Sequence, residues 1–194
     1  VDPYDYYAHF FNADQWEGDK TYRPFYYTGN AFLYDGFEPD PAEEQLIDEW
    51  VKYTGPSVSS TDAGSFIMGN YLTQMSELYQ QLGKKKPILS DTSFAQNSMT
   101  KYFIKRKDRE GLQYLIFAKK VEPYVTGDAY DWDAMDRDSL QMDALFTMGL
   151  GLYKTAKKDF YKLRYAYQLV RLAHYNEQYA QAVKLYDSLV APNH

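Results

Sequence analysis

A 3.6-residue repeat of apolar side chains between residues 162 and 190 is the strongest constraint that the sequence places on its fold. Apolar side chains recur there every three or four residues, from Leu163 to Ala173 and again from Tyr179 to Val190, with a break at Asn176. This spacing places them along one face of each of two helices. Because a short amphipathic helix is marginal in water until its apolar face is covered, the stretch predicts two helices packed on each other and on a third.

The helix best defined by its ends covers residues 41 to 54. Asp40 is suited to cap it, Pro41 fits a first helical turn because its missing N–H needs no partner there, and Glu43 completes a capping box. Gly55, followed by Pro56, predicts where the helix stops.

Two more helical regions follow before residue 123. A polar connector over 57–64 leads into one helix that we expect from residue 65 to residue 83. A helical hairpin is then predicted from residue 93, with its turn at 105–108 and its end at Pro123, because proline cannot continue a helix interior.

Six aspartates between residues 128 and 143 invite comparison with a calcium-binding loop. An EF-hand loop needs a glycine at its sixth position and a glutamate at its twelfth, but a loop counted from Asp131 has Asp136 and Met142 there. We therefore predict no metal site. Instead, Asp131 or Asp133 is expected to cap a helix that runs to about residue 155.

Two glycines, Gly149 and Gly151, fall inside that helix. An interior glycine costs a helix about 1 kcal/mol relative to alanine. The pair therefore predicts either a close approach by a neighbouring helix or a kink.

The first 38 residues differ from the rest in composition, with 13 aromatic side chains and five interspersed prolines and glycines. Such breakers forbid a long helix, so we expect an irregular segment packed on the helical body. Its rings serve either as core or as an exposed platform for a sugar ring or a peptide. The members expected on a platform are Tyr26, Tyr27, Phe32 and Tyr34.

Charge is distributed unevenly along the chain. The net charge is −6, and residues 1–40 carry all of it, since the other 154 residues hold 19 basic and 19 acidic side chains. A nucleic-acid-binding domain is normally basic, so no nucleic-acid partner is predicted. The basic run from Lys84 to Lys86 is interpreted as a solvated helix end. The chain contains no run of 18 apolar residues, so no membrane span is predicted.

Residues suited to catalysis are scarce. The chain has no cysteine and only three histidines, His9, His174 and His194. It also lacks a serine nucleophile elbow, an HExxH sequence and a phosphate-binding loop. We therefore predict a protein that is not an enzyme and that has no cofactor.

The last third of the chain resembles tetratricopeptide repeats over about residues 133–192. Leu169, Tyr179, Ala182 and Tyr186 stand where that family places its leucine, aromatic, alanine and second aromatic residues. The resemblance implies an all-α fold in which antiparallel helical hairpins form a right-handed stack. Asp108 and Asn176, in the turns of the two predicted hairpins, lie 68 residues apart, which is twice the period of this family.

The resemblance also implies a scaffold for protein partners. We predict a single α-helical domain over 1–194, with hairpins over 41–122 and 131–190, that binds a protein or peptide through exposed tyrosines and basic side chains such as Arg164 and Arg171.

The aromatic, acidic first segment is similar in character to exported helical envelope proteins of Gram-negative bacteria, including glycan-binding ones. That similarity implies a place in the periplasm or at the cell surface, within a larger exported protein, and gives the alternative function of glycan binding.

Overall fold

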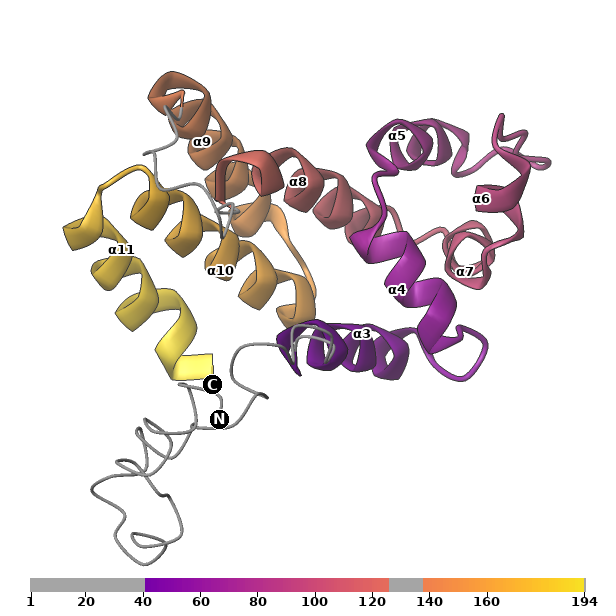
Figure 1. Ribbon diagram of the computed structural model, residues 1–194, viewed down its shortest axis with the longest axis horizontal. Coiled ribbons are helices and arrows are strands. Elements are labelled where there is room, and N and C mark those ends of the chain that lie inside the picture. The colour runs from indigo at the N-terminus through magenta and orange to yellow at the C-terminus, as the bar shows by residue number, and fades with distance from the viewer. Residues whose placement is uncertain (1–40, 126–137, 194) are drawn as a thin grey trace, which may run out of the picture. The chain divides into compact units, whose positions relative to one another are not determined.

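Helices account for all regular structure in residues 41–125 and 138–193, the residues that the computed structural model describes (Figure 1). Across these two ranges there are nine α-helices, one π-helical turn and one 3-10 turn, and no strand. The predicted all-α class is confirmed. The chain divides into two compact units, Val1–Leu46 and Ile47–His194, with the boundary inside the first described helix, α3.

The helices are, in chain order, α3 (Pro41–Thr54), α4 (Ser60–Met68), α5 (Leu72–Gln81), α6 (Thr92–Gln96), α7 (Ser98–Arg106), α8 (Arg109–Val125), α9 (Ser139–Thr155), α10 (Asp159–Tyr175) and α11 (Tyr179–Leu185), which continues into the π-helical turn η3 (Tyr186–Val190) and the 3-10 turn η4 (Ala191–Asn193). In this described part of the chain, no helix is long and apolar enough to cross a membrane.

Helix α10 is the central helix of the second unit, because it contacts α8, α9 and α11 (Figure 1). Its sequence accounts for this position: a helix with apolar side chains on more than one face is stable only when several neighbours cover it. The remaining helices pack in smaller groups, with α5 on α8 and with α4 and α6 on α7. The residues that α10 buries are Tyr161, Tyr165, Ala166, Gln168, Leu169, Leu172 and Ala173.

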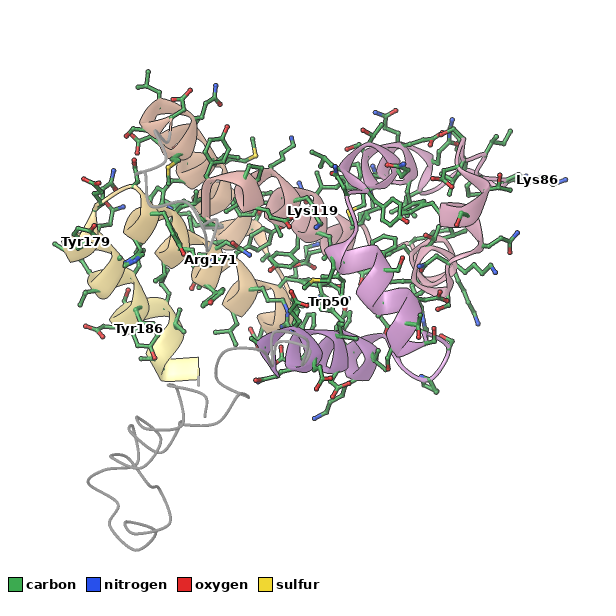
Figure 2. The ribbon with its side chains drawn as sticks, in the orientation of Figure 1. Trp50, Lys86, Lys119, Arg171, Tyr179 and Tyr186 are labelled. Carbon is green, nitrogen blue, oxygen red and sulfur yellow. The ribbon has the colours of Figure 1, made fainter. Side chains whose placement is uncertain are left out.

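Aromatic rings form the core where α3, α8 and α10 meet. Trp50, labelled in Figure 2, is fully buried. Its ring centroid lies 6.1 Å from that of Tyr114, nearly parallel, and 5.2 Å from that of Phe160, edge to face. Tyr165 meets Tyr114 edge-on at 5.2 Å. These offset and edge-to-face geometries are the favourable ones for aromatic pairs, so the contact fixes the angle between the helices as well as burying area.

Helix α3 has the predicted bounds. Gly55 adopts a left-handed φ of 87°, and its N–H donates to the Val51 carbonyl at 2.8 Å. This is the usual way in which a glycine ends a helix. The predicted cap, Asp40, lies outside the described residues.

The predicted connector over 57–64 and the single helix over 65–83 are wrong. Ser59 caps α4, its hydroxyl accepting the Asp62 N–H at 3.2 Å, so a helix begins where polar residues suggested a loop. The helix then breaks at Gly69, where a β-carbon would lie 2.5 Å from the Tyr71 ring. The close contact between Gly69 and Tyr71 at this break is one that helical periodicity does not reveal.

The predicted hairpin from residue 93 contains three helices, α6, α7 and α8. Asn97 separates the first two, because its side-chain oxygen caps α7 by accepting the Met99 N–H at 2.8 Å. Pro123 lies in the last turn of α8, which extends to Val125, so the predicted end at Pro123 is wrong. Asp138 caps α9 through the Gln141 N–H at 3.0 Å, so the predicted capping by Asp131 or Asp133 is also wrong.

The two glycines inside α9 have different surroundings. A β-carbon on Gly149 would lie 2.5 Å from Phe117 Cζ and 3.1 Å from Leu169 Cδ2, so α8 and α10 approach the helix closely there, as predicted. Gly151 has nothing within 4 Å of the same position. Only Gly149 is thus required by packing.

The end of the chain forms the second helix of the predicted pair, but with a change of winding. The Ala191 N–H donates to the Tyr186 carbonyl five residues earlier, which makes η3 a π-helical turn. The outward side of α11 and η3 exposes Tyr179, Val183 and Tyr186 (Figure 2). The right-handed repeat stack remains a prediction.

Substituting the two α9 glycines tests this packing. Gly149→Ala is expected to lower the free energy of unfolding by about 1–3 kcal/mol, because overpacking outweighs the gain in helix propensity. Gly151→Ala, the matched control, is expected to raise it by about 0.5–1 kcal/mol. Urea unfolding followed by circular dichroism measures both, and equal effects at the two positions would contradict the packing described.

Candidate functional site

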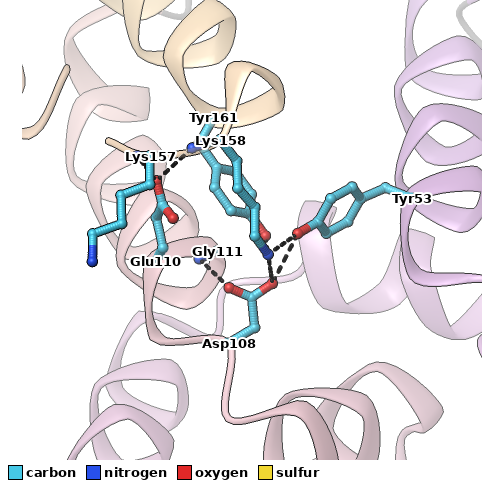
Figure 3. A network of polar contacts seen from close by, with 7 residues as sticks. All are labelled: Tyr53, Asp108, Glu110, Gly111, Lys157, Lys158 and Tyr161. Carbon is cyan, nitrogen blue, oxygen red and sulfur yellow. Dashed lines mark hydrogen bonds and ion pairs between the residues drawn. The ribbon is translucent and has the colours of Figure 1, made fainter. Parts of the chain in front are cut away.

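A buried carboxylate, Asp108, joins three helices (Figure 3). It stands between α7 and α8, directly after Lys107, which has a left-handed φ of 53°. Asp108 Oδ1 accepts the Gly111 N–H at 3.2 Å, so this carboxylate caps α8. Its other oxygen is left to bind groups from elsewhere in the fold.

Asp108 Oδ2 accepts three donors from α3 and from the start of α10. Tyr161 Oη donates at 2.7 Å, Tyr53 Oη at 3.1 Å, and Lys158 Nζ forms an ion pair at 3.3 Å. Lys158 Nζ also donates to Tyr53 Oη, which closes a ring of contacts. We call Tyr53, Asp108, Lys158 and Tyr161 the Asp108 network.

Gly111 makes room for the network. A β-carbon there would lie 2.3 Å from Tyr161 Oη, closer than two such atoms can approach. Because the glycine has no side chain, the tyrosine can pass over the first turn of α8 and reach the carboxylate. The glycine in this helix is therefore a requirement of the network.

A second carboxylate from α8 completes the joint. Lys158, the N-cap of α10, makes no capping bond with its own side chain. Instead, Glu110 Oε1 accepts the backbone N–H of Lys157 at 2.6 Å and that of Lys158 at 3.3 Å (Figure 3). These N–H groups precede α10, so the first turns of α8 and α10 are fixed to each other.

The pKa shifts in the network favour a fixed ion pair. Burial alone would raise the pKa of Asp108, but hydrogen bonds from Tyr161 and Gly111 and the charge of Lys158 lower it below its usual value. Burial alone would lower the pKa of Lys158, but Tyr53 and Asp108 raise it. Burial and the bond to Asp108 raise the pKa of Tyr161. Each group is thus held in one protonation state near neutral pH, whereas acid–base catalysis needs a pKa close to the working pH.

A groove of about 750 Å³ lies beside the network, between α3, the first half of α10 and the turn η3. We call it the α3–α10 groove. Tyr53 belongs both to the groove lining and to the Asp108 network. The full lining is Glu49, Lys52, Tyr53, Tyr153, Asp159, Phe160, Lys162, Leu163, Arg164 and Leu189.

Three stacked side chains form part of the groove wall. The Tyr53 and Phe160 rings are nearly parallel, with centroids 4.1 Å apart. The Arg164 guanidinium carbon lies 3.4 Å from the Phe160 centroid. Two groups so close to one ring must occupy its opposite faces, so Phe160 lies between Tyr53 and Arg164. The stack holds these three side chains in fixed positions along the groove wall.

Arg164, one of the predicted binding residues, lines this groove but is held from within. Its Nη2 pairs with Glu49 Oε2 at 2.5 Å, its Nη1 donates to the Phe160 carbonyl at 3.1 Å, and only 11% of its side chain is exposed. Arg164 therefore positions α3 against α10. Its role as a contact for a partner stays a prediction.

The other predicted binding residues lie elsewhere. Arg171, labelled in Figure 2, donates from Nη2 to the Val125 carbonyl at the end of α8 at 3.1 Å. The groove lining does not include Arg171. The proposed aromatic platform of Tyr26, Tyr27, Phe32 and Tyr34 lies outside the described residues. Across residues 41–125 and 138–193, no group of three or more acidic or histidine side chains could hold a metal ion.

Sequence reasoning missed the residues that build the site. The sequence places Asp108 only in a polar turn, and Tyr53 and Tyr161 belong to no local motif. One usable signal existed, because an aspartate three residues before a glycine inside an apolar pattern suggests a cap beside a tightly packed helix turn. The contact partners lie more than 50 residues apart in the chain, beyond the reach of local patterns.

Comparisons with known proteins provide no family for this chain. It matches no protein-family model, and no significant similarity to a curated protein or to a solved structure is found. The resemblance to tetratricopeptide repeats therefore stays a prediction.

The network predicts a specific loss of stability in acid. In the folded protein the pKa of Asp108 is below its usual value of 3.8, so its stabilising effect is present above about pH 4 and is lost as the pH falls through the lowered value. Asp108→Asn should lower the free energy of unfolding by about 1–3 kcal/mol at pH 7, and by progressively less below pH 4. Urea unfolding at a series of pH values measures this difference.

Asp187→Asn is the matched control, since Asp187 is exposed on η3. It should change the free energy of unfolding by no more than about 0.5 kcal/mol at any pH in the series. If Asp108→Asn behaved in the same way, the carboxylate would have no stabilising role.

Proposed function

We propose that this protein is a non-catalytic binding module whose α3–α10 groove receives an extended segment of a protein or peptide partner. The observation that carries the proposal is the groove itself, with its stacked aromatic wall and two lysines at its margin. Its volume of about 750 Å³ lies within the range of sites that bind several side chains or a small ligand.

The lining suits a peptide that carries both apolar and acidic side chains. Tyr53, Tyr153 and the edge of Phe160 offer aromatic surface, and aromatic side chains are enriched at the energetic centres of protein interfaces. Among the described lining residues, Lys52, Lys162 and Asp159 make no ion pair, so the two lysines outnumber the one acidic side chain and leave a positive charge for a partner. An aspartate or glutamate near an apolar side chain in the partner would match this combination.

The walls of the groove are held before any partner arrives. The Asp108 network fixes Tyr53, and the ion pair with Glu49 fixes Arg164. A surface that is already ordered loses little conformational freedom on binding, which favours affinity. The charged groups beside the groove also support binding in preference to catalysis. Asp108 and Lys158 are paired with each other, the pKa of Asp108 is lowered and that of Lys158 is raised, whereas an acid–base catalyst needs a pKa near the working pH.

A random peptide library selected on the full chain tests the proposal. Selected peptides should be enriched in acidic and aromatic or aliphatic residues. Their affinity for Lys52→Glu/Lys162→Glu should fall by about tenfold or more, as expected when two charges at the edge of an interface are reversed. Fluorescence anisotropy of a labelled peptide measures the affinities.

Lys154→Glu/Lys184→Glu is the control, because it makes the same change of charge at exposed lysines that do not line the groove. This variant should bind the peptides as the unmodified protein does. Equal losses in both double variants, or no loss in either, would show that the peptides bind elsewhere. A glycan array on the same protein tests the alternative function, and saccharide binding without peptide binding would overturn the proposal.

A further inference from the structure

Two basic segments of the sequence flank the contact between the end of α5 and the start of α8. Lys84, Lys85 and Lys86 follow the end of α5, and Lys105, Arg106 and Lys107 end α7. Arg109, which begins α8, connects the segments: its Nη1 donates to the Leu82 carbonyl at 3.0 Å, and its guanidinium lies 4.6 Å from the Tyr79 ring centroid. We call these seven basic residues the basic face.

The basic face is not neutralised within the described part of the chain. All seven side chains belong to exposed residues, and none of them takes part in an ion pair there. The acidic residues on the adjoining elements are engaged in other contacts. Asp108 points into its own network, Glu77 accepts from the N–H and hydroxyl of Ser90, and Asp91 caps α6. Since residues 41–194 carry equal numbers of basic and acidic side chains, this face is a local excess of charge.

An aliphatic side chain projects beside the lysines. Ile88 is 76% exposed, two residues after Lys86, whose side chain points away from the helices in Figure 2. The loop that carries both residues is held at its two ends. Gly83 takes a left-handed φ of 109° as α5 ends, and Glu77 binds Ser90 through three hydrogen bonds. Ile88 is therefore presented by an anchored loop, two residues after the Lys84–Lys86 run.

We propose that the basic face and Ile88 form a docking surface for an anionic phospholipid membrane. Each lysine or arginine close to such a surface adds attraction of several fold in binding constant, and an aliphatic side chain enters the boundary between headgroups and acyl chains. A nucleic acid would use the cations but not the isoleucine. A protein of that function normally adds aromatic rings for base stacking, whereas the ring in this face, Tyr79, is covered by Arg109.

Sedimentation with vesicles tests the docking surface on the full chain. We expect binding to vesicles of equal parts phosphatidylcholine and phosphatidylserine, little binding to phosphatidylcholine alone, and release at about 0.5 M salt, where charges are screened. Lys84→Glu/Lys85→Glu/Lys86→Glu should weaken binding by about tenfold or more. Ile88→Ser should weaken it several fold without changing the charge.

Lys120→Glu/Lys154→Glu/Lys184→Glu is the matched control. It changes the net charge by the same amount at lysines outside the basic face, and it should keep most of the binding. Circular dichroism checks that every variant is folded. Equal losses in both triple variants would overturn the proposal, because attraction would then depend on net charge alone.

Binding to a single-stranded or duplex oligonucleotide is the competing outcome. Oligonucleotide binding that depends on Lys84–Lys86, with no vesicle binding and no effect of Ile88→Ser, would assign the face to nucleic acid and overturn the membrane proposal. Absence of any vesicle binding at low salt would overturn it as well.

Discussion

The burial of one carboxylate, Asp108, is the constraint on which the centre of this fold depends. A carboxylate taken out of water costs several kcal/mol unless donors replace its hydration. Here two tyrosine hydroxyls, a lysine ammonium and a backbone N–H do so, and they come from α3, α8 and α10. Because all four donors must reach the two oxygens of Asp108, the rotation of each helix and its position along its axis are fixed together. Gly111 is part of this arrangement, since any side chain there would block Tyr161.

The same arrangement determines what surface the protein presents. Lys158, Tyr161 and Arg164 lie on successive turns at the start of α10, so the helix that donates to the carboxylate also carries the stacked wall of the α3–α10 groove. Tyr53 belongs to both, with its hydroxyl on Asp108 and its ring on Phe160. Displacing Tyr53 would therefore disturb a binding surface and a buried ion pair at once. Stability and recognition are linked through this side chain.

Local rules of the sequence were sufficient for part of this fold. The 3.6-residue repeat and the proline and glycine at its ends gave α3 its bounds, and the glycine inside α9 indicated a close helix contact at Gly149. The break between α4 and α5 at Gly69, where the Tyr71 ring lies close to the backbone, has no signal in the helical periodicity. The prediction of a single helix over 65–83 therefore joined two helices that the structure separates.

The candidate site was largely beyond local rules, because its partners are distant in the chain. Arg164 meets Glu49 across 115 positions, and Lys158 meets Tyr53 across 105. The spacing of 68 residues between Asp108 and Asn176 links two turns whose side chains do different things. Asp108 is buried as the cap of α8, while Asn176 binds Ser139 and Asp143 of α9 at the surface. A spacing of two repeat periods therefore did not identify positions with the same structural role.

In the π-helical turn η3, the number of residues matters to the groove wall as much as their identity. A turn closed by a bond over five residues holds one residue more than an α-helical turn. In η3, Val190 is buried while Leu189 lines the groove. Deleting Ser188 would remove the additional residue of this turn, and we expect Leu189 to face a different side as a result. A deletion in this turn would thus alter one wall of the groove.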